Sequence, residues 1–272
     1  MKRYLVPVSL ALTAGLVLTS VASAAAPQLD QKTVYMMDDI TAVFEQGANA
    51  PQYGNIENDK DGCGWTAGWI GFCTATGDML ELVEKYNKAK PGNVLEKYTP
   101  TLRKLADSGS DSVKELGTKF PADWKTAAKD KAFQQLQIKI GHDLYLTPAL
   151  TIAGQIGIKT NLGVENLFDT ALMMGPGPKD CDGMPKIVKE TTAAVGGTPA
   201  TGKNEKAWLK TYNEIRVKHM KKPCTPGREA DWPQAVDRSE ALQKLSDTGK
   251  QDLRPPLTVG GGYDVTITNP HD

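Results

Sequence analysis

Two carboxylates, Glu45 and Asp61, are the residues best placed for acid–base chemistry. Glu45 stands beside Phe44 at the end of an expected helix, where an apolar neighbour and the helix dipole both disfavour a charged carboxyl. Asp61 follows sixteen residues later in a glycine-rich loop, where a carboxyl stays ionised. One acid that keeps its proton and one that has lost it form the pair that hydrolysis of a glycosidic bond requires. Residue types alone do not single this pair out, because most of the 32 acidic residues are expected to be surface charges.

The sequence lacks the short motifs of most other hydrolytic and nucleotide-binding sites. It contains no G-x-S-x-G, P-loop or H-E-x-x-H motif, and its three histidines are scattered. Residues 59–62 resemble part of a calcium-binding loop, but Gly68 occupies the position of the closing glutamate. We therefore expect neither a metal nor any other cofactor.

Helical and loop segments are expected to position the two carboxylates. Apolar residues recur every three or four positions from Gln31 to Phe44, which predicts a helix that ends next to Glu45. Asp30 suits the N-cap of this helix and Gly47 its C′ position. Residues 47–77 are rich in glycine and predict a loop with short strands, so Asp61 falls outside the helices.

Further helices are predicted along most of the chain. Asp78 and Glu81 resemble a capping box that begins one helix. Asp123 is expected to cap a long helix that reaches Ile140, and Pro100 is expected to kink an earlier one. The other predicted helical segments are 95–105, 148–158, 162–174, 208–220 and 239–245, and residues 265–267 predict a short final strand. The chain is therefore expected to be mainly helical.

The N-terminus has the pattern of a secretory signal peptide. Lys2 and Arg3 precede an apolar run that extends to Val21, and the small residues 22–24 follow it. A membrane anchor is the alternative, but polar residues interrupt the run, so we expect cleavage and a single exported domain of residues 25–272. Loss of residues 1–24 removes two of the 32 basic residues and none of the 32 acidic ones, which leaves a formal charge of −2. This balance argues against a nucleic-acid partner.

The four cysteines suggest disulfides in an exported chain, and four cysteines allow three pairings. We favour Cys63–Cys73 and Cys181–Cys224, because each pair brackets one local segment. A zinc site is the rival interpretation. It is disfavoured because the chain has no C-x-x-C motif and no histidines at ligand spacing.

The stretch from Asp61 to Glu84 carries a specific family resemblance. It reads DGCGWTAGWIGFCTATGDMLELVE and closely resembles the signature of the chitosanases of glycoside hydrolase family 46. Further matches to that family are Pro91–Asn93, Asp123–Trp124, Phe133–Gln135, Phe168–Asp169, Met174–Gly177, Asn213–Arg216 and Leu253–Leu257. Cys63 departs from the pattern, because the residue before Gly64 is often basic in relatives.

The resemblance implies a mainly helical, two-lobed fold similar to lysozyme, with a small sheet in one lobe and a substrate cleft between the lobes. It also implies cleavage of chitosan, a β-1,4-linked glucosamine polymer, within the chain and with inversion. By position, Glu45 resembles the general acid, Asp61 the general base and Thr66 the residue that helps to hold the attacking water. Asp78 resembles a carboxylate that binds a substrate amino group, using one oxygen while the other serves its helix.

The remaining candidate residues support the acid or attract the substrate. Asp169 and Arg216 resemble a buried charge network behind the acid, and Arg238 is expected to complete it although the local alignment slips by about two residues. Glu57 is one of the acids expected to draw in a polycation. Trp65 is expected to stack on sugar rings.

Two other functions remain open at this point. One keeps the scaffold but cleaves an N-acetylated glycan, as a lysozyme or chitinase does, and Asp78 argues against it because a carboxylate suits a free ammonium better. The other is a non-catalytic exported carbohydrate-binding protein, which the presence of both carboxylates disfavours. We expect a secreted monomer whose partner is chitosan, with no nucleic-acid partner and no membrane partner after cleavage.

Overall fold

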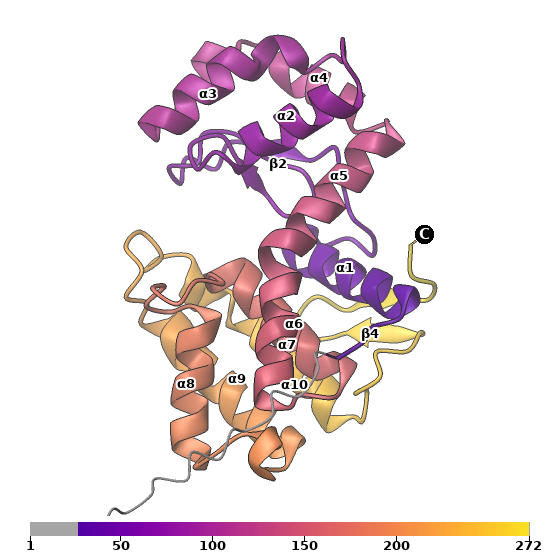
Figure 1. The fold of residues 1–272 in the computed structure, drawn as a ribbon, viewed down its shortest axis with the longest axis vertical. Helices are drawn as coiled ribbons and strands as arrows, with labels where there is room; N and C mark the ends of the chain where they lie inside the picture. Colours follow the sequence, from indigo (N-terminus) through magenta and orange to yellow (C-terminus); the bar gives the residue numbers. More distant parts are fainter. Residues whose placement is uncertain (1–26, 272) are drawn as a thin grey trace, which may run out of the picture.

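The computed structural model describes residues 27–271, which form two lobes joined by a long helical rod (Figure 1). The expected signal peptide, residues 1–24, lies outside the described residues. One lobe contains three short strands with α2 (Asp78–Ala89), α3 (Thr99–Ser108) and α4 (Phe120–Ala127). The other contains α1 (Gln31–Gln46), α7 (Asn161–Met174), α8 (Met184–Val195), α9 (Glu205–Lys221), α10 (Val236–Asp247) and a two-stranded sheet of β4 (Leu257–Val259) and β5 (Val265–Ile267). The expected mainly helical architecture is confirmed. We call these parts the sheet lobe and the helical lobe.

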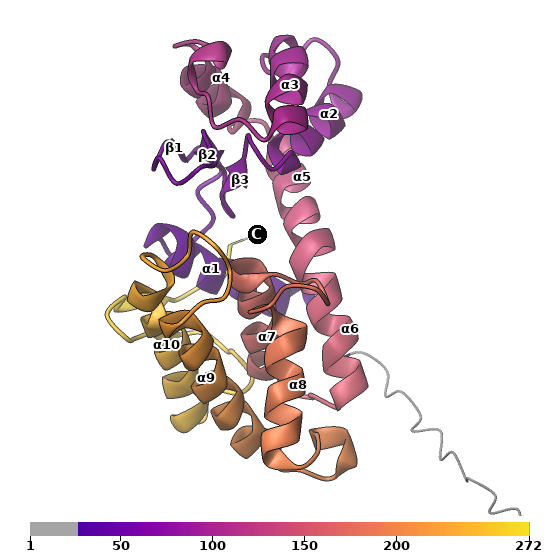
Figure 2. The same ribbon diagram turned by 90° about the vertical axis from the view of Figure 1, so that its left-hand side faces the viewer.

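The rod between the lobes consists of α5 (Lys131–Gly141), a π-helical turn (His142–Leu146) and α6 (Thr147–Ile156) (Figures 1 and 2). Gly141 allows Trp69 of the sheet lobe to pack directly on this rod. A Cβ atom at Gly141 would lie only 2.8 Å from Cζ2 of Trp69. Wide turns of this kind inside helices often accompany functional sites.

The sheet of the sheet lobe is small and antiparallel, in the order β1 (Ile56–Glu57), β2 (Thr66–Ala67), β3 (Phe72–Cys73). Thr66 on the central strand pairs with Glu57 on one side and with Cys73 on the other. Strands of two residues supply few hydrogen bonds, so packing and covalent links must help to fix this part of the chain. The expectation of short strands within residues 47–77 is confirmed.

Helix α7 is the centre of the helical lobe. Every side chain from Leu162 to Ala171 is buried, and the helix packs against α1, α6, α8, α9 and α10. Because neighbours surround it, its polar residues are buried as well. Asp169 is one of these residues.

Three local expectations are wrong, because in each case the helix begins at a residue other than the predicted one. The single helix from Asp123 to Ile140 is in fact α4 and α5, because Asp130 accepts a hydrogen bond from the backbone N–H of Ala132 and caps a new helix. Pro100 does not kink a helix but lies in the first turn of α3, where its missing N–H costs nothing. Gly77, not Asp78, is the N-cap of α2.

Helix α8 has no counterpart among the predicted segments. It is rich in β-branched residues and lies between two glycine-rich stretches, so its local propensity is modest. Packing against α9 accounts for its formation. Within residues 27–271, no helix combines the length and the apolar character needed to cross a membrane.

Candidate active site

Glu45 lies in the last turn of α1 and lines a pocket together with Thr66 and other residues of the sheet lobe. The helix ends at Gly47, whose φ of 63° lets its N–H bond to carbonyls of the preceding turn. The neighbouring Gln46 ties this end to the sheet lobe, since its Nε2 donates to the carbonyls of Gln52 and Gly68 at 3.1 Å each. These bonds fix the position of Glu45 relative to the sheet.

A buried chain of alternating charges supports Glu45. Nη1 of Arg238 donates to Oε1 of Glu45 at 2.6 Å, and Nη2 of Arg238 donates to Oδ1 of Asp169 at 2.5 Å. Nη2 of Arg216 forms an ion pair with the other oxygen of Asp169 at 2.5 Å. The side chains of Asp169 and Arg216 are fully buried. The structure thus brings Asp169, Arg216 and Arg238 together behind Glu45, and it identifies Arg238 as the second arginine of the network.

The network is ionised because its charges compensate one another. Burial raises the pKa of Asp169, but the guanidiniums of Arg238 and Arg216 outweigh burial and leave this pKa lowered. Burial disfavours the cation of Arg238, but Asp169 and Glu45 outweigh it and raise the pKa of Arg238. Removing one member would leave an unpaired buried charge, which is costly.

The surroundings of Glu45 differ from those expected from the sequence. The ring of Phe44 lies 5.1 Å from Cζ of Arg238 and so packs against the guanidinium. The local pattern points only to Phe44 and the helix end, and the family resemblance alone suggests a cation behind Glu45. Since Arg238 lies 193 residues from Glu45 along the chain, no local pattern could reveal the contact.

A pocket of about 180 Å³ contains Glu45 and Thr66 on its walls, together with Glu57 and Asp59. Oγ1 of Thr66 is buried and has no hydrogen-bond partner among the described residues. A buried hydroxyl without a partner is costly, so this atom is well suited to bind a water or a substrate group in the pocket. The pocket brings together three of the predicted site residues, Glu45, Thr66 and Glu57.

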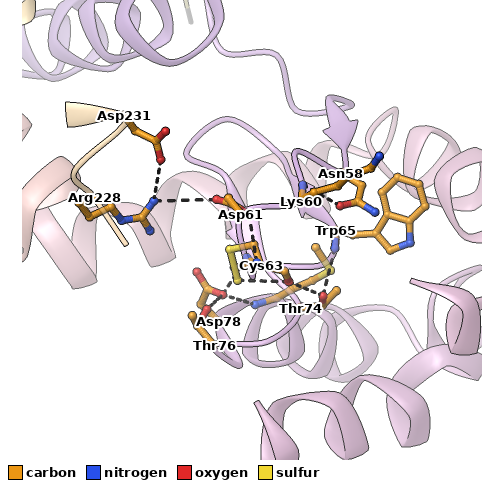
Figure 3. The surroundings of a disulfide bond; sticks show 12 residues. Asn58, Lys60, Asp61, Cys63, Trp65, Thr74, Thr76, Asp78, Arg228 and Asp231 are labelled. Atoms are coloured by element: carbon orange, nitrogen blue, oxygen red, sulfur yellow. Dashed lines mark hydrogen bonds and ion pairs between the residues drawn. A yellow bond between two sulfur atoms is a disulfide. The ribbon is translucent and has the colours of Figure 1, made fainter. Parts of the chain in front are cut away.

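Asp61 lies in the loop between β1 and β2, five residues before Thr66. Its Oδ1 accepts a hydrogen bond from the backbone N–H of Cys63 at 3.1 Å. Its Oδ2 lies 3.9 Å from Nη1 of Arg228, which belongs to the helical lobe (Figure 3). Asp61 does not line the pocket that contains Glu45. Its side chain is 29% exposed, close to the 24% of Glu45.

Asp78 organises the turn between β3 and α2 with one of its two carboxylate oxygens (Figure 3). Its Oδ1 accepts hydrogen bonds from the backbone N–H groups of Cys73 and Met79, both at 2.9 Å, and from the hydroxyl of Thr76 at 2.8 Å. None of these bonds involves Oδ2. Burial raises the pKa of Asp78, although these hydrogen bonds oppose the shift. A cation at Oδ2 would offset the cost of burying this carboxylate.

Tyr145 is a residue of this region that the sequence interpretation missed. It lies in the π-helical turn of the rod. Burial, followed by the negative charges of Asp78 and Glu45, raises the pKa of its phenol to about 12. The phenol therefore remains a hydrogen-bond donor near both carboxylates. No sequence motif marks it, because only the fold brings it there.

The two tryptophans of the glycine-rich segment differ in exposure. Trp69 is fully buried and lies edge-on to the ring of His142, which is a core position. Trp65 is only partly buried and packs against the core. Its indole nitrogen is buried and lacks a partner within the described part of the chain. Trp65 is thus the tryptophan that retains exposed surface.

Both disulfides favoured from the sequence are present, with Cα–Cα distances of 5.2 Å for Cys63–Cys73 and 6.2 Å for Cys181–Cys224. Near the second, Asp182 accepts hydrogen bonds from the backbone N–H of Cys224 and from His219. The group of Cys181, Asp182 and Cys224 is compact enough to suggest metal ligands, but its two sulfurs are bonded to each other. These cysteines are therefore not thiolate ligands for zinc.

A two-lobed helical fold with a carboxylate-lined pocket where the lobes meet defines the chain as a glycoside hydrolase of the lysozyme-like kind. The model of glycosyl hydrolase family 46 matches residues 39–257. A chitosanase from Bacillus subtilis is 36% identical over 244 residues, which cover 90% of this chain and 87% of that protein. A chitosanase from a Streptomyces species is 39% identical over 217 residues, covering 78% of this chain and 73% of its own.

Solved structures agree with these sequence matches. The complex of a Gynuella sunshinyii family 46 chitosanase with chitotetraose superposes with a TM-score of 0.81 at 35% identity, covering 88% of this chain and 99% of that one. The native chitosanase of a Bacillus subtilis strain gives the same TM-score and identity, covering 88% and 98%. The chain belongs to glycosyl hydrolase family 46. The predicted family and its lysozyme-like fold are thereby confirmed.

Proposed function

We propose that this chain is a secreted, endo-acting chitosanase that cleaves β-1,4 links between glucosamine units with inversion. The observation that carries the proposal is the pocket in which Glu45, held by Arg238, faces a space shared with the unpartnered hydroxyl of Thr66. Its family relatives that are named as chitosanases add to this support.

In the proposed reaction Glu45 is the general acid. It protonates the glycosidic oxygen, which is a poor leaving group until it gains a proton. The carboxylate left behind then accepts the hydrogen bond from Arg238 at full charge. Since Arg238 is itself held by Asp169, this stabilisation exists before the proton leaves.

Asp61 is the general base of the proposed reaction. It removes a proton from a water that attacks the anomeric carbon from the face opposite the leaving group. Oγ1 of Thr66 helps to hold that water, because this buried hydroxyl has no other partner in the described structure. Inversion requires carboxyls roughly 6.5–9.5 Å apart, so that a water fits between base and sugar. The placement of the acid at a helix end and the base on a separate loop is compatible with such a gap.

Acidic side chains account for the choice of an amine-bearing polymer. Oδ2 of Asp78 is available to an ammonium group, while Oδ1 remains engaged with the turn. Glu57 and Asp59 line the same pocket as Glu45 and add negative charge. Trp65 supplies a face for a sugar ring. An N-acetyl group offers no positive charge, so we propose chitosan over chitin or peptidoglycan.

Export is part of the proposal. Residues 1–24 have the pattern of a cleaved leader, and the two disulfides suit an oxidising compartment. The enzyme then acts as a monomer without a cofactor.

A reducing-end assay tests the proposed function. The purified chain should release reducing ends rapidly from highly deacetylated chitosan and far more slowly from poorly deacetylated material. Comparable rates on both would favour a hydrolase of N-acetylated glycans. Binding to chitosan without any release of reducing ends would identify a carbohydrate-binding protein instead.

A further inference from the structure

An ion pair between Arg228 and Asp61 bridges the two lobes (Figure 3). Nη1 of Arg228 lies 3.9 Å from Oδ2 of Asp61 and 3.6 Å from Oδ2 of Asp231. Among the described residues, no other ion pair joins the sheet lobe, residues 48–130, to the helical lobe. The contact therefore joins two lobes that are otherwise connected mainly through α1 and the rod.

Disulfides anchor both sides of this contact. Asp61 lies two residues before Cys63, which is bonded to Cys73, and its Oδ1 accepts the N–H of Cys63. Arg228 lies four residues after Cys224, which is bonded to Cys181. Each charged side chain thus stands on a loop whose base is covalently fixed within its own lobe.

Asp182 strengthens the anchor on the Arg228 side. Its Oδ2 accepts the backbone N–H groups of Cys224 and Thr225, both at 2.8 Å, and its Oδ1 contacts Nδ1 of His219 at 2.8 Å. Asp182 is almost completely buried, although it belongs to a loop. This arrangement fixes where the segment of residues 223–231, which we call the crossing loop, leaves the helical lobe.

The distance between Arg228 and Asp61 limits how much this ion pair can contribute to stability. A separation of 3.9 Å exceeds that of a hydrogen bond, and both side chains are partly exposed, at 38% and 29%. Exposed ion pairs contribute little to stability. The pair matters instead because it involves Asp61, which has no other charged partner among the described residues.

We propose that Arg228 is a positioning residue that acts through Asp61. This inference rests on the proposed function, in which Asp61 is the general base. A cationic polymer can block an exposed general base, because its ammonium groups can form ion pairs with the carboxylate. The guanidinium beside Oδ2 repels those groups and restricts the rotation of the carboxylate, so Asp61 stays aimed at water.

Steady-state kinetics on a glucosamine hexamer test the positioning role. Arg228→Ala should lower kcat about tenfold without raising KM, since productive alignment is lost while binding remains. Arg228→Lys should recover part of kcat because it restores the positive charge. Arg254→Ala is the matched control, since Arg254 is exposed and pairs only with Asp252 among the residues described. Wild-type kcat in Arg228→Ala, or a loss expressed only in KM, would overturn the positioning role.

Hydrogen exchange of the full chain tests the contact without any activity measurement. In Arg228→Ala, amides in residues 58–66 and in the crossing loop should both exchange faster. Asp61→Asn should speed exchange in the crossing loop as well, and Arg254→Ala should change neither segment. Unchanged exchange in both variants would overturn the contact between the lobes. If the wild-type chain fails to cleave chitosan while exchange in the two segments remains coupled, the proposed function fails and the contact between Arg228 and Asp61 stands.

Discussion

Glu45 and Asp61 stand in contrasting surroundings. Glu45 is bonded to Arg238 at 2.6 Å, and that arginine continues into a buried network with Asp169 and Arg216. Asp61 stands on a loop, with one backbone hydrogen bond and one cation at 3.9 Å. The two side chains are similarly exposed, at 24% and 29%, but only Glu45 is hydrogen-bonded to a buried charge network.

The two proposed roles account for this difference. A general acid becomes negatively charged as the bond breaks, so a fixed cation behind it lowers the barrier. A general base takes a proton from a water molecule that enters with the substrate, so one of its oxygens must remain free of strong hydrogen bonds. The network at Glu45 therefore stabilises the negative charge that forms on this acid. The loop that carries Asp61 leaves Oδ2 without a strong hydrogen bond, so that it can accept a proton from water. The following variants test this comparison.

Replacing the carboxyls should give the largest effects. Glu45→Gln should lower kcat on chitosan by about 10³–10⁴-fold, because proton donation is lost, while Arg238 can still donate to the amide oxygen. Asp61→Asn should cause a similar loss of turnover. Circular dichroism and thermal unfolding should show that both variants remain folded. Near-normal rates in either variant would remove that residue from its proposed role.

Breaking the buried network should also lower stability strongly. Asp169→Asn leaves Arg216 and Arg238 without their shared carboxylate and should cost about 3–5 kcal/mol in the free energy of unfolding by urea. Since the pKa of Asp169 is lowered in the folded chain, its stabilising effect is full above the unfolded carboxyl value of about 3.9 and is lost as the pH falls through its folded pKa. The difference in the free energy of unfolding between wild type and Asp169→Asn should therefore become smaller at acidic pH.

The matched control for that experiment is Asp252→Asn. Asp252 is exposed and pairs with exposed Arg254, so its replacement should change stability little. An equal loss of unfolding free energy in Asp169→Asn and Asp252→Asn would mean that burial does not determine how much the network contributes to stability.

Removing the hydroxyl of Thr66 should give a smaller effect, on turnover. Thr66→Val keeps the shape of the side chain but removes Oγ1, and it should lower kcat about 10–100-fold with little change in KM. Thr66→Ser retains a hydroxyl and serves as the control. If Thr66→Val instead raises KM and leaves kcat intact, Thr66 contacts substrate and does not position water.

The smallest expected effect concerns the proposed amine-binding carboxylate. Asp78→Asn should raise KM on chitosan about tenfold, equivalent to about 1.4 kcal/mol, because the attraction between Oδ2 and an ammonium is lost. The dependence of kcat/KM on salt should weaken at the same time. Glu81→Gln on the same helix is the control, since Glu81 pairs with Lys85 on the exposed surface. Unchanged KM and salt dependence would assign Asp78 to the turn alone.

Local patterns in the sequence predict much of this structure. The end of α1 follows from apolar spacing and Gly47, and the two disulfides follow from bracketing of short segments. Competing caps are harder to rank, which is why Asp130 divides a helix that the apolar stripe predicts as continuous. The family resemblance, and not local chemistry, suggests Asp169 and Arg216 as network members.

Contacts between distant segments lie beyond local patterns. Tyr145, Asp182 and Arg228 have unremarkable sequence neighbours, and each gains its importance from the residues that the fold brings to it. At Glu45 the local pattern predicts the apolar neighbour Phe44 but not the guanidinium from α10 that packs on it.

The stereochemistry of the first product tests most directly the claim that Glu45 and Asp61 act from opposite faces of the sugar. Proton NMR of a fresh digest of glucosamine oligomers follows the anomeric signals before mutarotation equalises them. The account predicts that the α-anomer appears first, because water attacks opposite the leaving group. Early accumulation of the β-anomer would show retention and would contradict the role of Asp61 as general base.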